Sequence, residues 1–198
     1  MPLPPLVLAS SSPRRVALLA ALGVTPAVRP APVDETPAAG EDPTALARRL
    51  ARAKAEAVAE WGEVVVGADT VVVLDGVALG KPVDPAEGEA MLRRLSGRAH
   101  EVVTGVAVVH DGRVEVASEV TAVAFRAVDD DEVAWYSATG EAMDKAGGYG
   151  IQGAASLFVA GIEGSYANVV GLPVVSLDAL CRRLGWPLRA WSGRPPGA

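Results

Sequence analysis

The 198-residue chain is half apolar and about one-fifth charged, which is the composition of a soluble globular protein. Its formal net charge of −6 argues against binding of polymeric nucleic acid, and no apolar run approaches the roughly 20 residues of a membrane helix. A single cysteine excludes an internal disulfide and favours the cytoplasm, and two histidines are too few for a usual zinc site, so any metal is expected to be Mg²⁺ or Mn²⁺ on carboxylates.

Strand and helix patterns alternate along the whole chain. Ser12-Pro13 and Asp42-Pro43 each predict a helix start, and Asp111-Gly112 predicts a hairpin turn. In chain order, the patterns predict a strand at 6–9, a helix at 14–22, an extended segment at 26–37, a helix from 43 to about 61, a strand at 64–74, a helix at 85–95, strands at 102–109 and 114–126, a helix at 129–137, a glycine-rich loop at 145–155, a strand at 157–162 and a helix at 175–184. This alternation is typical of a single α/β or mixed α+β fold.

The segment SSSPRR at residues 10–15 is the first with a chemical signature. A strand leads into a polar turn and then a helix N-terminus, where unpaired backbone N–H groups and the helix dipole favour an anion. Arg14 and Arg15 in the first turn oppose the dipole, so an anion such as a polyphosphate is expected to offset them. The alternative is a serine cap with two solvated arginines, because the chain contains no P-loop motif.

Asp69 interrupts the apolar run VVVGADTVVVL. A carboxylate inside a buried strand is costly unless it is paired, hydrogen-bonded or bound to a metal. Gly67 and Ala68 before it are expected to leave room for a ligand, and Thr70 adds a hydroxyl. The alternative is that the strand ends here and Asp69 caps a loop.

Four further charged residues are candidates for the same site. Asp34 and Glu35 lie in the extended segment and would form a surface acid pair on their own, but either could join Asp69 in holding a divalent ion. Lys81 lies in a loop just after the Asp69 strand. Lys54 lies in an alanine-rich helix, and from the residues alone it is expected on a solvated face.

The segment DKAGGYGIQG at residues 144–153 combines several glycines with Lys145, Tyr149 and Gln152. Glycine permits close approach of the backbone to a ligand, and a glutamine amide presents a donor beside an acceptor. That pair matches the O4 and N3–H edge of uracil or thymine. The alternative is a loop with its glutamine in solvent.

These segments occur together, in this order, in one known family. The chain resembles the Maf (septum-formation-inhibitor-like) nucleotide pyrophosphatases from Leu8 to Pro173. The matching segments are LASSSPRR, VDE, ARAKA, VVGADTVVVLDG, LGKP, MLRRLSGRAHEVVTGVAV, DKAGGYGIQG and GSYANVVGLP. The resemblance implies an elongated, mixed α/β fold of the Maf/ITPase-like kind, with a twisted mixed β-sheet flanked by helices and two lobes around a central cleft.

The resemblance also implies a nucleoside triphosphate pyrophosphatase that uses a divalent metal cation, Mg²⁺ or Mn²⁺. The products of such an enzyme are the nucleoside monophosphate and pyrophosphate. The family's catalytic proton acceptor falls on Asp69, and Glu35 is its other acid, so these two residues are the expected metal ligands. The substrate-binding positions fall on Ser10, Arg14, Arg15, Lys54, Thr70, Lys81 and Gln152.

The YGIQG form of the glycine-rich loop resembles the branch that acts on dTTP and UTP. The branch that acts on 7-methyl-GTP has a glutamate where Gln152 stands, which suits the two donors of a guanine edge. Two alternatives stay open: a 7-methyl-GTP or broad-specificity pyrophosphatase, and a nucleotide-binding regulator of cell division.

The expected organisation is one domain at residues 1–185 and a C-terminal tail at 186–198, with Trp186 and Trp191 as anchors. Cys181 is expected to be an inert core thiol. The expected partner is the nucleoside triphosphate substrate, with neither polymeric nucleic acid nor a membrane. The sequence leaves the oligomeric state open, with a homodimer as one alternative.

Overall fold

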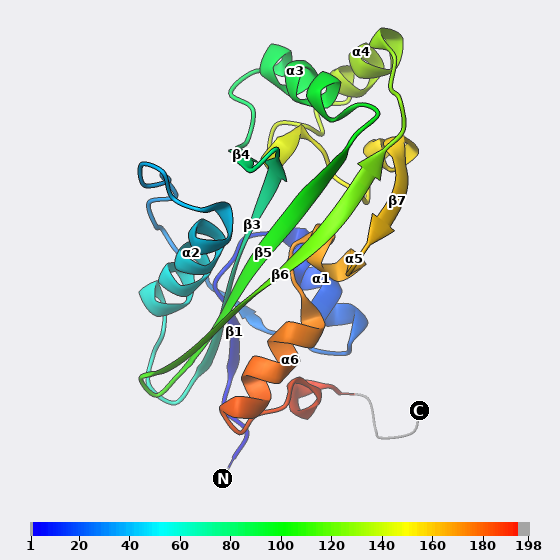
Figure 1. Cartoon of the computed structure of the whole chain (residues 1–198). Helices are drawn as coiled ribbons and strands as arrows, with labels where there is room; N and C mark the ends of the chain where they lie inside the picture. The colour runs from blue at the N-terminus through cyan, green and yellow to red at the C-terminus, as the bar shows by residue number, and fades with distance from the viewer. Residues whose placement is uncertain (1, 194–198) are drawn as a thin grey trace. The chain divides into compact units, whose positions relative to one another are not determined.

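A computed structural model describes residues 2–193 (Figure 1). The strands are β1 Leu6–Leu8, β2 Ala27–Val28, β3 Val64–Leu74, β4 Val77–Leu79, β5 Ala99–His110, β6 Arg113–Phe125 and β7 Val159–Glu163. The α-helices are α1 Pro13–Ala21, α2 Pro43–Ala57, α3 Pro85–Leu95, α4 Asp130–Ala138, α5 Tyr166–Val170 and α6 Val174–Arg183, and the 3₁₀ turns are η1 Ala146–Gly148, η2 Ala154–Phe158 and η3 Leu188–Trp191. No helix in this part of the chain is both long and apolar enough to span a membrane.

The strands form one seven-stranded sheet in the order β2-β1-β3-β5-β6-β7, with β4 paired to β3. The β1 strand runs parallel to β2 and β3, whereas the β3–β4 and β6–β7 pairs are antiparallel. The predicted mixed α/β fold with a mixed sheet and helices is therefore confirmed. The chain folds into two compact units: unit 1 comprises residues up to 69, 104–119 and from 171, and unit 2 comprises 70–103 and 120–170.

The two faces of the sheet in unit 1 bury different sets of apolar side chains, as the alternation along a strand requires. Along β3, Val64, Val66 and Ala68 join one core cluster with residues of α1 and α6. Val65 joins the other cluster, with alanines of α2. Odd-numbered positions of β3 therefore face α2, and this alternation carries Asp69 to the α2 face.

Gly67 and Gly105 permit helix α2 to approach the sheet closely. A Cβ atom at Gly67 would lie 2.1 Å from the Ala51 carbonyl oxygen, and one at Gly105 would lie 2.1 Å from the Ala47 carbonyl oxygen. The expectation that Gly67 leaves room for a ligand is thus wrong, because the α2 backbone fills that space. The close approach instead brings the side chains of α2 onto the strand that carries Asp69.

The core of unit 2 is richer in aromatic rings. Phe125, Tyr149 and Phe158 belong to one buried cluster. The His100 ring packs edge-on against Phe125 and Tyr149, and its Nε2 atom hydrogen-bonds to the Tyr149 hydroxyl at 2.6 Å. Helices α3 and α4 lie against each other in this unit (Figure 1).

Burial should make His100 a pH-sensitive element of stability. Desolvation lowers the pKa of His100 from 6.5 to about 4 in the folded chain. Between those pH values the unfolded chain takes up a proton that the folded chain does not, so stability is full above pH 6.5 and falls by about 3 kcal/mol as the pH drops to about 4. Denaturant unfolding at several pH values should show a shallower decline for His100→Gln, which cannot take up that proton. Equal pH dependence of the two proteins would contradict the assignment.

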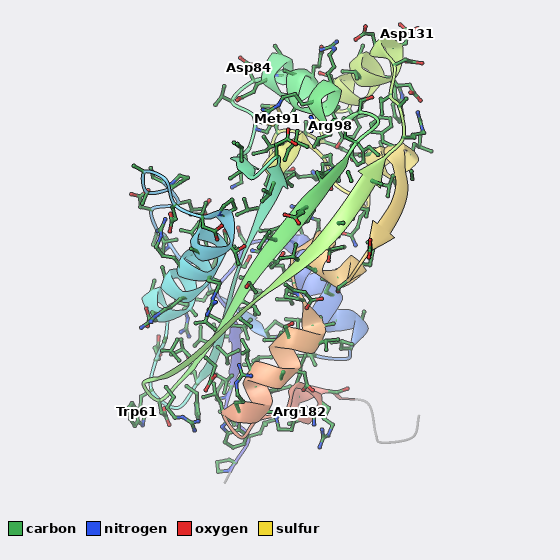
Figure 2. All side chains as sticks on the ribbon, in the orientation of Figure 1. Trp61, Asp84, Met91, Arg98, Asp131 and Arg182 are labelled. Atoms are coloured by element: carbon green, nitrogen blue, oxygen red, sulfur yellow. The ribbon has the colours of Figure 1, made fainter. Side chains whose placement is uncertain are left out.

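Most predicted elements are confirmed, and β3 and α3 have the expected bounds. Helix α2, however, ends at Ala57 and not near Trp61, which is labelled in Figure 2. Val58 leaves helical geometry, and its carbonyl oxygen accepts a hydrogen bond from Arg29. The short elements β2, β4 and α5 carried too few residues to show a period in the sequence.

The structure describes residues 186–193 of the expected C-terminal tail. Leu188–Trp191 forms a 3₁₀ turn, and Trp191 Nε1 donates a hydrogen bond to the Pro4 carbonyl oxygen at 2.7 Å. Trp186 and Trp191 also pack against the core of unit 1. The last five residues of that tail, 194–198, lie outside the described part of the chain.

Candidate active site

Lys54 and Asp69 form a buried ion pair in unit 1. Lys54 is 8% exposed and Asp69 is 9% exposed, and Lys54 Nζ lies 2.6 Å from Asp69 Oδ1. The expectation of a solvated face for Lys54 is wrong, because α2 turns this residue towards the sheet between the buried Ala51 and Ala55. The cost of placing Asp69 inside an apolar strand is therefore offset by a charged hydrogen bond.

Glu35 joins the same ammonium group. Its Oε1 atom lies 2.5 Å from Lys54 Nζ, and its side chain remains 47% exposed. Asp34, the other acid of the predicted pair, instead accepts hydrogen bonds from the Thr36 side chain and from the Thr36 backbone N–H, and both bonds lower the pKa of Asp34. The structure thus separates the two neighbours, with Asp34 in a local turn and Glu35 at the Lys54–Asp69 pair.

Arg15 projects from the first turn of α1 and is held on two sides. Its Nε atom donates to the Gly171 carbonyl oxygen at 2.7 Å, and Nη1 donates to Ser10 Oγ at 3.0 Å. Ser10 Oγ also accepts from the Ser12 backbone N–H, and Ser12 makes no side-chain cap bond to the helix. Carbonyl and hydroxyl oxygens of the protein thus orient this arginine at the helix N-terminus.

The electrostatics of unit 1 couple Arg15 to both acids. Burial lowers the pKa of Arg15, while the negative charges of Asp69 and Glu35 act to raise it. Burial raises the pKa of Asp69, and the positive charges of Lys54 and Arg15 oppose that shift. We call Ser10, Arg15, Glu35, Lys54 and Asp69 the charged cluster. Arg14, partly buried, precedes Arg15 in α1.

Three predicted residues lie in unit 2: Thr70, Lys81 and Gln152. Thr70 directly follows Asp69 on β3 and is partly buried, and Lys81 is exposed in the loop after β4. The Gly147 N–H donates to the Gly80 carbonyl oxygen at 2.9 Å. This bond joins the loop that carries Lys81 to the glycine-rich segment that carries Gln152.

Gln152 is the third residue of a four-residue turn, Gly150–Gly153, closed by a hydrogen bond from the Gly153 N–H to the Gly150 carbonyl oxygen at 3.1 Å. Ile151 is buried and Gln152 is exposed. The Gln152 side chain makes no hydrogen bond or ion pair with any residue between 2 and 193. Its amide is therefore presented outward from an anchored turn.

The donor set of the charged cluster suits a hard cation. Glu35 and Asp69 supply carboxylate oxygens, which Mg²⁺ and Mn²⁺ prefer, and Mg²⁺ commonly takes one or two carboxylates together with substrate phosphates and water. Within residues 2–193 no group of three or more histidine, cysteine, aspartate or glutamate side chains could hold a metal. Glu35 and Asp69 are the residues of the charged cluster whose side chains could hold such a cation.

Two contacts, one within each unit, involve groups that the sequence did not single out. The Gly171 carbonyl oxygen orients Arg15, and a backbone carbonyl leaves no side-chain signal. The Glu141 carboxylate accepts the Ala154 N–H next to the Gln152 turn. Glu141 lies three residues before the start of the glycine-rich motif, and this position was the available signal.

The mixed sheet and its helices define an α/β protein. In unit 1, a buried carboxylate–lysine pair and an arginine that is hydrogen-bonded at a helix N-terminus form a candidate site for an anionic, phosphorylated ligand. A family model described as Maf-like protein matches residues 5–184. The chain therefore belongs to the Maf-like protein family.

Several curated proteins are similar over nearly their whole length. A dTTP/UTP pyrophosphatase of Myxococcus xanthus is 53% identical over 92% of this chain and 94% of its own. Proteins of the same name from Anaeromyxobacter dehalogenans and Symbiobacterium thermophilum are 52% and 49% identical, over 93% and 92% of this chain and 96% and 95% of their own. Among solved structures, a HAM1 protein from Coxiella burnetii aligns with a TM-score of 0.42 and 19% identity, over 62% of this chain and 73% of that one.

Proposed function

We propose that this chain is a nucleoside triphosphate pyrophosphatase that hydrolyses dTTP and UTP to the monophosphate and pyrophosphate. The observation that carries the proposal is the 53% identity to a dTTP/UTP pyrophosphatase over 92% of the chain. The charged cluster supports it, because its buried carboxylate can accept a proton and its two cations, Arg15 and Lys54, favour a polyphosphate.

In the proposed mechanism, Asp69 accepts a proton from a water molecule that attacks the α-phosphorus. The bond from the water oxygen to the α-phosphorus forms as the bond to the bridging oxygen breaks, and pyrophosphate leaves. Lys54 holds Asp69 in position through their 2.6 Å hydrogen bond. Arg14, Arg15 and Lys81 are proposed to neutralise charge on the phosphates.

Glu35 and Asp69 are the residues proposed to hold the Mg²⁺ or Mn²⁺ ion. When bound, such an ion supplies Lewis-acid polarisation of the phosphoryl oxygens. The Lys54 ammonium lies within 2.6 Å of an oxygen of each carboxylate, so it limits their mutual repulsion in the protein alone.

The proposed location is the cytoplasm. The only cysteine of the chain, Cys181, is buried and free, and burial raises the pKa of its thiol to about 12. The thiol therefore stays protonated and unreactive at neutral pH, as an inert core residue does.

A substrate panel tests the proposal. Purified protein with Mg²⁺ or Mn²⁺ should convert dTTP and UTP with much higher kcat/KM than CTP or 7-methyl-GTP, and excess chelator should abolish the activity. Preference for 7-methyl-GTP would favour the other branch of the family. Binding of nucleotides without any turnover would favour a regulator that does not catalyse.

Gln152→Glu should reverse part of this preference. The carboxylate would face O4 of thymine or uracil with no donor, which costs roughly 1–3 kcal/mol and lowers kcat/KM for dTTP and UTP about ten- to a hundredfold. The kcat/KM for 7-methyl-GTP, whose guanine-type edge presents two donors, should fall less or rise. The measurement is kcat/KM for dTTP, UTP, CTP and 7-methyl-GTP, with Gln152→Ala as the control that removes the amide without adding a charge. An equal loss for all four nucleotides would show that Gln152 does not select the base.

A further inference from the structure

The turn that presents Gln152 is packed at both ends against one short segment, residues 141–145. Past Gln152, the Ala154 N–H donates to both carboxylate oxygens of Glu141, at 3.1 and 3.3 Å. A Cβ atom at Gly153 would lie only 1.9 Å from Glu141 Oε2. The Glu141 carboxylate therefore lies flush against the backbone that follows Gln152.

The other end of the turn rests on Lys145. A Cβ atom at Gly150 would lie 2.6 Å from Lys145 Cε and 2.8 Å from its Cδ atom. The Lys145 ammonium donates to the Glu141 carbonyl oxygen at 2.6 Å and to Asp144 Oδ1 at 2.5 Å, which holds the methylene stem in place. Both glycines that flank Ile151 and Gln152 thus lie in close contact with a side chain, one with a carboxylate and one with a lysine stem.

These contacts bear on how an exposed glutamine can select a base. A primary amide has a donor and an acceptor on one carbon, so a rotation of its plane exchanges them and would match cytosine as well as thymine. The Gln152 amide has no partner of its own among the described residues, so its position is set by the backbone of its turn. Selection between bases therefore depends on how firmly that backbone is held.

We infer that Glu141 is a positioning residue for base selection, which fixes the Gln152 turn through the Ala154 N–H. This inference rests on the proposed function. Loss of the carboxylate should make the 150–154 backbone more mobile. The Gln152 amide should then bind cytosine and thymine with more similar affinity. The expected change is therefore in the ratio of substrates and not only in the rate.

The test compares Glu141→Ala with Asp178→Ala. Asp178 is a matched control in unit 1, since its carboxylate also accepts a backbone N–H, that of Leu188 at 2.7 Å, and it lies outside the charged cluster and the Gln152 turn. We expect Glu141→Ala to lower the ratio of kcat/KM for dTTP to kcat/KM for CTP about tenfold, the scale of one misplaced hydrogen bond. Asp178→Ala should keep the wild-type ratio even if its thermal stability falls.

Two conservative variants keep the test decisive if Glu141→Ala folds poorly. Glu141→Gln retains an acceptor oxygen for the Ala154 N–H and should keep most of the wild-type dTTP-to-CTP ratio of kcat/KM. Glu141→Asp withdraws the carboxylate by one methylene and should lower it. Hydrogen exchange of the 150–154 backbone, measured without nucleotide, should be faster in Glu141→Ala and Glu141→Asp than in the wild type and in Asp178→Ala.

The outcomes separate this inference from the proposed function. A wild-type ratio in both Glu141→Ala and Glu141→Asp, or equal losses for dTTP and CTP, would overturn the role of Glu141 and leave the pyrophosphatase assignment standing. Unchanged hydrogen exchange in the turn would also overturn it. A wild-type protein that cleaves dTTP, UTP and CTP equally well would overturn both the role of Glu141 and the proposed selectivity for dTTP and UTP, and absence of any turnover would overturn the pyrophosphatase assignment itself.

Discussion

Asp69→Asn should lower kcat for dTTP and UTP by at least about 10²-fold, the smaller end of the range for a lost acid–base group. Asparagine keeps the shape of the side chain on the α2 face of β3 but cannot accept a proton from water. It also withdraws one of the two carboxylates proposed to hold the metal ion. The measurement is steady-state kinetics at saturating Mg²⁺ or Mn²⁺.

The matched control for this substitution is Asp75→Asn. Asp75 stands just after the same strand, in an exposed turn with a φ angle of 53°, where asparagine is well tolerated. It pairs with Arg98 and lies outside the charged cluster. We expect Asp75→Asn to keep near-normal turnover, so near-normal turnover of Asp69→Asn as well would show that Asp69 is not the base.

Lys54→Met should both destabilise the protein and impair catalysis. Removal of one partner of a buried ion pair leaves an uncompensated charge, here on Asp69, and costs about 3 kcal/mol or more. The half-exposed Glu35 places the expected loss at the lower end of that range. The measurement is denaturant unfolding, together with kcat/KM for dTTP.

Two comparisons isolate the cause of that loss. Arg52→Met removes another cation from the same helix, where Arg52 makes an exposed pair with Glu56, and should change stability little. The double variant Lys54→Met with Asp69→Asn should be more stable than Lys54→Met alone, because the unpaired carboxylate is gone. If Lys54→Met and the wild type unfold at the same midpoint denaturant concentration, the result would contradict the stabilising role of the buried pair.

The elements that the sequence predicts best are those that have many residues and clear signals at both ends. β3 is an eleven-residue run, apolar except around Asp69, that Asp75-Gly76 follows, and α3 begins after the Asp84 cap and ends before Gly97, so both were predicted to the residue. The end of α2 was predicted too late, and the Val58 carbonyl oxygen at that end accepts a hydrogen bond from Arg29, which is distant in sequence. Long-range contacts of this kind have no local pattern.

The same division holds for the candidate site. Asp69 stands out in the sequence because a carboxylate in an apolar strand needs a partner. The identity of that partner depends on which face of α2 packs on the sheet, and Gly67 and Gly105 set this by allowing the helix backbone to approach. The alternation of β3 and the alanine-rich sequence of α2 do not show which face of the helix packs on the strand, so Lys54 was assigned to solvent on residue pattern alone.

In the proposed reaction, water attacks the α-phosphorus and pyrophosphate leaves. Hydrolysis of dTTP in ¹⁸O-labelled water, followed by mass spectrometry of the products, shows which phosphorus atom the water attacks. We expect dTMP that carries one ¹⁸O atom and pyrophosphate that carries none. Label in the pyrophosphate would place the attack at the β-phosphorus, and release of orthophosphate with dTDP would contradict the proposed reaction altogether.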